Sequence, residues 1–180
     1  MKRFVLLFVA ISFIYAQMSF TGNTETRLGE SSSGFYYNET LINTNLQYGA
    51  FTNWIQLEYS DPPELGRRIN GVRKLRLEYD NGPIKLKLGD LYEIWCRGLV
   101  LNSVDDQSLD RDTGIRGLTL IYNTDSFSTQ FIAGRADISQ STINALGFNN
   151  RKHNYHISHN LYGLNTQKLF GDHDLGFSFL

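Results

Sequence analysis

The feature that most constrains the fold is a strict alternation of apolar and polar residues on both sides of one short turn. Leu75, Leu77 and Tyr79 alternate with charged residues, and the alternation resumes over residues 84–88. A period of two is typical of a β-strand with one apolar face, and residues 80–83 between the runs form turns readily. We predict a hairpin with the apolar pairs Tyr79–Ile84, Leu77–Leu86 and Leu75–Leu88, with Glu78 opposite Lys85 and Arg76 opposite Lys87.

Similar patterns recur along the whole chain of 180 residues, which contains 12 Phe, 10 Tyr and 16 Gly. Aromatic residues favour strands, and no useful amphipathic helix is found. We expect roughly ten strands, and besides the hairpin they include residues 18–28, 35–48, 51–60, 118–123, 127–135, 153–161 and 174–180. Residues 61–71 and 137–150 are expected to be loops, and a polar link containing Gly163 and Gly171 should separate the last two strands.

The first sixteen residues have the organisation of an export signal. Lys2 and Arg3 precede an apolar run over residues 4–14, and Ala16 provides a small residue for cleavage before Gln17. The apolar run is shorter than the roughly 20 residues of a membrane-spanning helix. We therefore predict a signal peptide over residues 1–16 and one β-domain over residues 17–180 of an exported protein.

Charge and cysteine content limit the partners. The formal net charge is −1, and without Lys2 and Arg3 the chain has 15 basic and 18 acidic residues, a net charge of −3. No basic run is interleaved with aromatic residues, so we expect no nucleic-acid partner. Cys96 is the only cysteine, which rules out a disulfide within the chain.

The alternation is interrupted once, over residues 89–117, where glycine and charge are concentrated. The candidate functional residues of this stretch are Gly89, Asp90, Tyr92, Glu93, Arg97, Gly98, Asp105, Asp106, Arg111, Arg116 and Gly117. Its acidic and basic residues are nearly balanced, so they can neutralise one another in a polar lumen or at the rim of a barrel. An ordinary solvated loop is the alternative.

Three other interpretations, a catalytic carboxylate pair and two metal sites, have less support than the polar lumen or rim. Asp90 and Glu93 would have to converge to act as a catalytic carboxylate pair, but a spacing of three puts them on opposite faces of a strand. Residues 110–114 resemble a calcium loop but lack the acidic residue at its twelfth position, and His153, His156 and His159 would share a face only on a helix. We predict no metal, no cofactor and no catalysis, and keep a metal- or carboxylate-dependent hydrolase as a minor alternative.

The central stretch also resembles a known family. The segments Gly89-Asp90-Leu91-Tyr92-Glu93, Gly98-Leu99-Val100-Leu101, Asp105-Asp106 and Ile115-Arg116-Gly117 are similar to a pattern in outer-membrane β-barrel proteins of unknown function from Bacteroidetes and related bacteria, the DUF6029-type family. The resemblance covers about residues 56–135. Where the pattern has Gly-x-Gly, this chain has Cys96-Arg97-Gly98, so Cys96 stands at the position of the first glycine. If that position needs a positive φ, Cys96 has to adopt it.

The resemblance implies an outer-membrane protein whose partners are membrane lipid and the barrel-assembly machinery. Members of the family are longer, and the last alternating residues, Leu175, Phe177 and Phe179, are followed by Leu180 rather than ending on an aromatic residue. We therefore expect the N-terminal part of a longer barrel.

These observations predict an all-β fold, an antiparallel up-and-down sheet that forms a complete or incomplete transmembrane β-barrel. The expected role is a pore, transport or structural protein. A soluble secreted β-sandwich that binds glycans or a cell-surface partner through Trp54, Trp95 and tyrosines is the alternative.

Overall fold

The structure is a computed structural model that describes residues 18–30, 34–64, 68–106, 111–141, 153–171 and 173–180. Its long strands are β1 (Met18–Glu30), β2 (Tyr36–Tyr48), β3 (Phe51–Ser60), β4 (Asn70–Asp80), β5 (Ile84–Leu91), β10 (Ile115–Asn123), β11 (Phe127–Ser141), β12 (His153–Phe170) and β13 (His173–Phe179). Between β5 and β10 lie β6 (Ile94–Trp95), the 3-10 turn η1 (Cys96–Gly98), β7 (Leu101–Asn102), β8 (Asp105–Asp106) and β9 (Arg111–Asp112). The predicted all-β fold is confirmed for this part of the chain.

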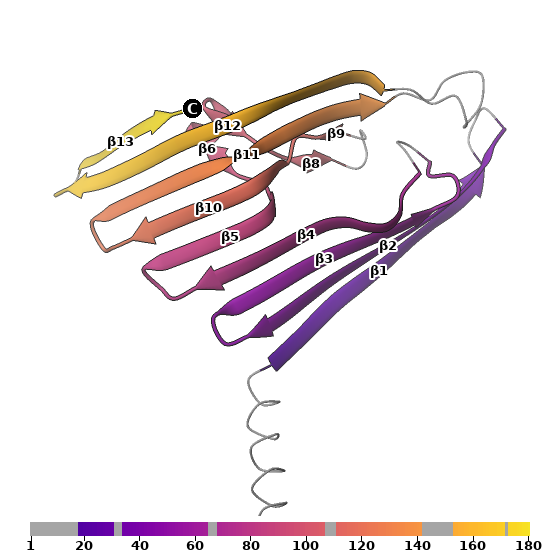
Figure 1. Cartoon of the computed structure of the whole chain (residues 1–180), viewed down its shortest axis with the longest axis horizontal. Helices are drawn as coiled ribbons and strands as arrows, with labels where there is room; N and C mark the ends of the chain where they lie inside the picture. Colours follow the sequence, from indigo (N-terminus) through magenta and orange to yellow (C-terminus); the bar gives the residue numbers. More distant parts are fainter. Residues whose placement is uncertain (1–17, 31–33, 65–67, 107–110, 142–152, 172) are drawn as a thin grey trace, which may run out of the picture.

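The long strands form one antiparallel sheet in the order β1-β2-β3-β4-β5-β10-β11-β12-β13, so each strand pairs with its neighbours along the chain (Figure 1). Short turns join β2 to β3, β4 to β5, β10 to β11 and β12 to β13, and all lie at one end of the sheet. The C-terminal ends of β1, β3 and β11 lie at the opposite end of the sheet, and the described part of the segment between β5 and β10 folds over the sheet. The predicted up-and-down topology is therefore confirmed.

The sheet has two open edges within the described residues. On the main path β1 pairs only with β2, and β13 pairs only with β12. The antiparallel sheet is thus observed, and a closed barrel is not. Among the described residues, no helix has the length and apolar character needed to cross a membrane.

Two predicted strand boundaries are wrong. β11 continues to Ser141, so residues 137–141 of the expected loop belong to a strand, and residues 142–150 lie outside the described part. β12 is one strand as far as Phe170, where a polar link was expected. Its polar second half pairs with β11 on one side and β13 on the other. Ladder hydrogen bonds on both sides satisfy the backbone, so this segment does not need an apolar pattern to remain extended.

The β4–β5 hairpin forms where predicted but in another register. Tyr79 lies opposite Leu86 rather than Ile84, and Leu77 lies opposite Leu88. The turn is closed by the pair Asp80–Lys85, with Asn81 N–H donating to the carbonyl of Ile84 over 2.9 Å. A shift of two residues keeps each side chain on its predicted face. It also relieves the expected clash of charges, because Arg76 now faces Gly89 and Glu78 faces Lys87.

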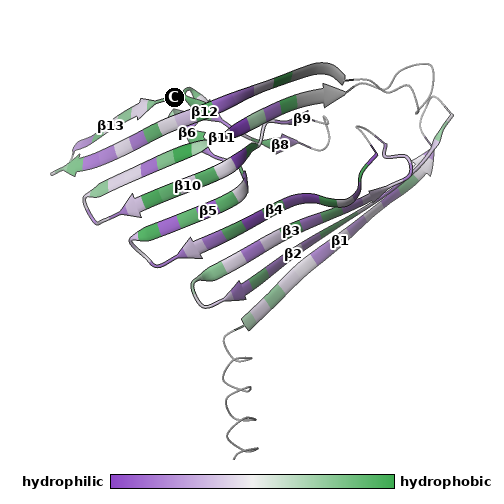
Figure 2. Ribbon diagram, in the orientation of Figure 1, coloured by the Kyte–Doolittle hydropathy of each residue, from purple (hydrophilic) through white to green (hydrophobic). Residues whose placement is uncertain are grey.

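One face of the sheet, called here the outer face, carries apolar side chains in register across every strand of the main path. Its outer row is Met18, Tyr48, Phe51, Tyr79, Leu86, Leu120, Phe131, Leu164 and Phe179. Seven of these nine side chains are at least 40% exposed, and Tyr79 and Leu86 are half-buried. Figure 2 shows apolar positions recurring along neighbouring strands.

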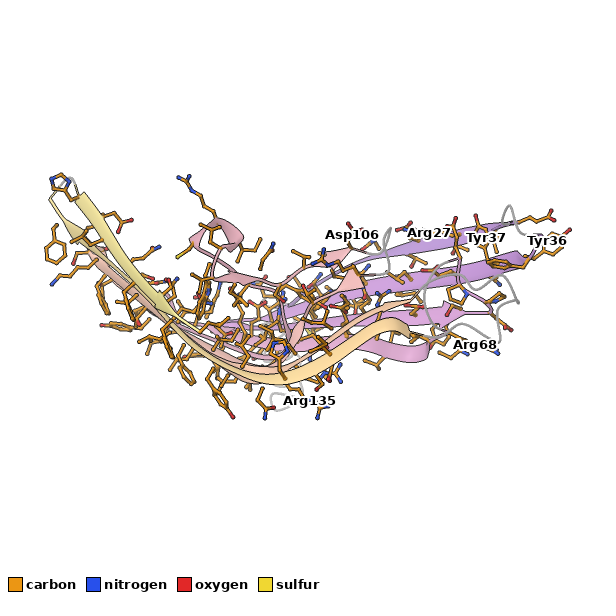
Figure 3. The ribbon with its side chains drawn as sticks, turned by 90° about the horizontal axis from the view of Figure 1, so that it is seen from above. Arg27, Tyr36, Tyr37, Arg68, Asp106 and Arg135 are labelled. Atoms are coloured by element: carbon orange, nitrogen blue, oxygen red, sulfur yellow. The ribbon has the colours of Figure 1, made fainter. Side chains whose placement is uncertain are left out.

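The opposite, inner face is covered in part by the insert, defined as residues 92–114 between β5 and β10. In Figure 3 the insert residue Asp106 lies on the hollow side of the bent sheet, and Arg135 of β11 points from the convex side. The buried core lies on this inner side and consists of Leu91, Trp95, Leu101, Ile115, Ile132, Ala136 and Leu161. The inner-face hydrophobic residues of β5, β10, β11 and β12 are therefore buried with residues of the insert, and the outer face remains uncovered.

Candidate functional site: the inner face and its insert

Trp95 is the anchor of the insert. The side chain is 2% exposed, and its indole Nε1 donates a hydrogen bond of 2.9 Å to Oε1 of Gln130 on β11. A buried indole requires such a partner because its N–H has lost water. The ring also lies against Gly163 of β12, where a Cβ would be 2.8 Å from Cζ3. Trp95 thus ties the insert to two strands that follow it in the chain.

The base of the insert is closed by hydrogen bonds to buried hydroxyl groups. Oγ of Ser103 donates to the carbonyl oxygens of Thr113 over 2.6 Å and Leu91 over 3.3 Å. Oγ1 of Thr113 accepts from the backbone N–H of Val104 over 2.8 Å. Ser103 and Thr113 are both buried, so these bonds satisfy polar groups that would otherwise be costly in the core.

Lys74 connects β4 to the insert by ion pairs. Its ammonium group forms ion pairs with Asp105 and, over 3.2 Å, with Asp112, and it lies 4.7 Å from the centre of the Tyr92 ring. The Lys74 side chain is 3% exposed. A buried ammonium of this kind requires compensation, which two carboxylates and an aromatic face provide.

Arg73 extends this network toward β3. It occupies the irregular position where Gln56 pairs with Lys74 but Leu57 pairs with Val72. The Arg73 guanidinium pairs with Glu58 over 2.8 Å and with Asp105 over 3.5 Å. The extra residue places two consecutive basic side chains within reach of the same insert carboxylate, which regular alternation would prevent.

Tyr92 completes what we call the inner ionic cluster, namely Glu58, Arg73, Lys74, Tyr92, Asp105 and Asp112. The Tyr92 hydroxyl donates to the two carboxylate oxygens of Asp112 over 3.1 and 3.3 Å. Burial, followed by the negative charge of Asp112, raises the pKa of Tyr92 above its ordinary value. The phenol therefore stays a hydrogen-bond donor, and the cluster is a fixed set of neutralised charges.

The two carboxylates considered as a catalytic pair do not converge. Asp90 is one of the outer-face residues of β5. Its carboxylate accepts hydrogen bonds from Nε of Arg116 over 3.0 Å and from the backbone N–H of Leu75 over 2.8 Å. Glu93 instead pairs with Lys87 over 2.6 Å. Because Lys87 and Asp90 lie on opposite faces of β5, each acid is engaged on its own side of the sheet.

The tip of the insert has unusual backbone geometry. Cys96, Arg97 and Gly98 have φ values of 50°, 56° and 85°. Positive φ is unfavourable for residues with a Cβ, so the first two positions are strained and the third suits glycine. Cys96, which stands where the resembled pattern has a glycine, therefore takes a positive φ. Arg97 is exposed, so it does not join the inner ionic cluster.

The remaining candidates have structural positions. Gly89 and Gly117 are neighbours in register on β5 and β10, and a Cβ on either would overlap a backbone carbonyl of the next strand. Asp106 pairs in register with Arg111 in the short β8–β9 ladder, which extends the insert toward β11. The two glycines therefore allow close approach of neighbouring strands, and Asp105, which precedes Asp106, pairs with Arg73 and Lys74 in the inner ionic cluster.

No metal site is found among the described residues, in which no group of three His, Cys, Asp or Glu side chains could hold an ion. The suggested calcium loop begins at Asp110, which lies outside the described part. Trp95, proposed for glycan contact in the sandwich alternative, is buried, and Trp54 lies beneath the Arg76 guanidinium at 5.0 Å. That alternative therefore loses one of its two tryptophans.

The candidate list from the sequence missed four members of the cluster, namely Glu58, Arg73, Lys74 and Asp112. A signal was present, because two adjacent basic residues interrupt the alternation that begins at Leu75. Their partners could not be identified without knowing that the insert folds back across β4.

No family model, curated protein or solved structure matches this chain. The function is therefore argued from the fold and the two faces of the sheet.

Proposed function

We propose that this chain forms the wall of an outer-membrane β-barrel, with the outer face against lipid and the inner face toward the lumen. The observation that carries the proposal is the outer row, which places apolar side chains in register on all nine strands of the main path, seven of them at least 40% exposed. A soluble protein rarely exposes a continuous apolar surface of this extent.

Strand length supports the same environment. A membrane-spanning β-strand needs roughly 9–11 residues. β10 has 9, β3 has 10 and β4 has 11 residues, and β5 has 8. On the outer face of β3, Phe51 and Tyr59 are separated by about 26 Å of extended chain, which at a strand tilt of about 40° spans about 20 Å of the roughly 25 Å apolar band.

The arrangement of connections is a further argument. Short turns at one end of the strands and longer connections at the other are typical of outer-membrane barrels, whose short turns face the periplasm. By this comparison the ends of β2, β4, β10 and β12 lie at the periplasmic side.

The inner face suits a restricted lumen. The insert is held on this face by Trp95 and by the inner ionic cluster, in which acidic and basic groups offset one another. We propose a non-catalytic role in transport or in the structure of the membrane, with the insert narrowing the lumen. An open wet lumen would not bury Ile132 of the inner face completely, whereas this residue packs in one core with Trp95 and Leu101 of the insert.

The test is incorporation of the full chain into phosphatidylcholine vesicles, followed by flotation in a density gradient at high salt. Residue-specific contact with lipid is measured with Leu120→Trp and brominated lipid in a Trp54→Phe background, where quenching of the new tryptophan is expected. Gln47→Trp on the inner face is the matched control and should be quenched much less. Recovery of a folded, monomeric protein without detergent or vesicles would instead favour a soluble sandwich and would contradict the proposal.

A further inference from the structure

Two arginines lie side by side on the outer face, where the apolar surface ends. Arg116 of β10 is directly opposite Arg135 of β11. Their side chains are 72% and 61% exposed. Like charges directly opposite each other on one face of a sheet repel, so this pair requires compensating anions.

Each arginine forms an ion pair with one carboxylate, Arg116 with Asp90 and Arg135 with Asp137. Oδ1 of Asp90 accepts from Nε and Nη2 of Arg116, each over 3.0 Å. Oδ1 of Asp137 accepts from Nε of Arg135 over 3.1 Å. A guanidinium has five N–H donors, so these contacts orient each group and leave donors for a further acceptor. Asp90 and Asp137 reduce the net charge of the site, so recognition depends on the directed donors.

The position of the pair relative to the apolar surface identifies the class of ligand. The next row toward the hairpin turns is Leu88, Leu118, Ala133 and Tyr162, in which Tyr162 is 63% exposed. Asn160, which is exposed and in register with Arg135, offers a neutral amide beside the pair. Guanidinium groups at the border of a lipid-facing surface lie at the depth of the headgroups, and their planar donors match phosphate oxygens.

We infer that Arg116 and Arg135 form a binding site for the phosphate group of an anionic membrane lipid. The acyl chains of this lipid lie along the apolar residues below the pair, and the phosphate bridges the two guanidinium groups. The inference rests on the proposed membrane location and adds a lipid preference to it. It also gives a reason for two opposed arginines at the border of the apolar outer face.

The experiment uses the full chain in phosphatidylcholine vesicles that contain phosphatidylglycerol as the anionic probe. Lipids that remain with the protein after mild detergent extraction are counted by mass spectrometry, and enrichment of phosphatidylglycerol is expected. Arg135→Gln should lower this enrichment about fivefold, the equivalent of roughly 1 kcal/mol for one basic residue at a membrane surface. The partner of Arg135 is the exposed Asp137, so this change leaves no buried charge.

Arg27→Gln is the matched control, because Arg27 is also ion-paired but lies in the inner-face series of β1. It removes the same charge and should leave the enrichment unchanged. The double variant Asp90→Asn/Arg116→Gln keeps the net charge and should lower the enrichment as Arg135→Gln does.

The outcomes separate the two proposals. A chain that does not float with vesicles contradicts the membrane location itself. Insertion without enrichment of phosphatidylglycerol in the unmodified chain, or an equal loss in Arg27→Gln and Arg135→Gln, overturns the lipid site and leaves the membrane location standing.

Discussion

The indole ring of Trp95 lies so close to Gly163 that a Cβ on the glycine would be 2.8 Å from Cζ3. This contact joins the tip of the insert to β12, on the far side of β10 and β11 in the sheet. It makes the insert part of the core, so changes at either residue should act on the stability of the whole sheet.

Gly163→Ala should destabilise the protein by about 1–3 kcal/mol, because the added methyl group overpacks a closed site. Urea unfolding followed by circular dichroism measures the change. The loss of stability should be smaller in a Trp95→Phe background, where the aromatic side chain is smaller. Gly176→Ala is the control, since its Cβ would meet Gln167 Cγ at an ordinary 3.5 Å. Equal costs at both glycines would show that Trp95 does not press on β12.

Cys96→Gly should raise the free energy of unfolding by about 0.5–1 kcal/mol. Cys96 has a φ of 50°, which is strained for a residue with a Cβ, and this gain exceeds the entropy that glycine adds to the unfolded chain. Cys96→Ala is the matched control, because it removes the thiol but keeps the Cβ. If alanine stabilises as much as glycine, the thiol rather than the backbone is responsible.

Lys74→Met should cost about 2–3 kcal/mol, because it leaves the insert carboxylates Asp105 and Asp112 without their buried cation. Lys85→Met removes a lysine from an exposed pair with Asp80 and should cost less than about 1 kcal/mol. Chemical unfolding of the two variants side by side measures the difference. Similar small costs would mean that the inner ionic cluster is open to water.

The faces of the strands and much of the topology could be predicted from the sequence. The contacts between the insert and distant strands could not. Alternation at Leu75, Leu77 and Tyr79 fixed which side chains share a face, because that depends only on local backbone geometry. The contact of Trp95 with Gly163 depends on where the insert folds, and no local pattern encodes it. The same holds for Lys74, whose acidic partners come from a distant segment.

Removal of the Tyr92 hydroxyl should change the response to alkaline pH. Its pKa is raised in the folded protein, so above about pH 10, the ordinary tyrosine pKa, the unfolded state loses this proton first and stability falls as pH rises. Tyr92→Phe should reduce the steepness of that fall. At neutral pH it should cost about 1.5–3 kcal/mol, from loss of the hydrogen bond to Asp112. Tyr48→Phe, on the exposed outer row, controls for the loss of a phenol.

The register of the β4–β5 hairpin can be distinguished by engineered disulfides. The turn alone allowed Leu77 to face either Leu86 or Leu88, and a shift of two residues preserves the faces, so alternation could not decide between them. In a Cys96→Ala background, Leu77→Cys/Leu88→Cys should oxidise readily, because directly opposed residues have the Cα separation that a disulfide needs. Leu77→Cys/Leu86→Cys places the thiols on a diagonal and should remain reduced under the same conditions. Mass spectrometry after mild oxidation and thiol alkylation measures both, and preferential crosslinking of the second pair would restore the register expected from the turn.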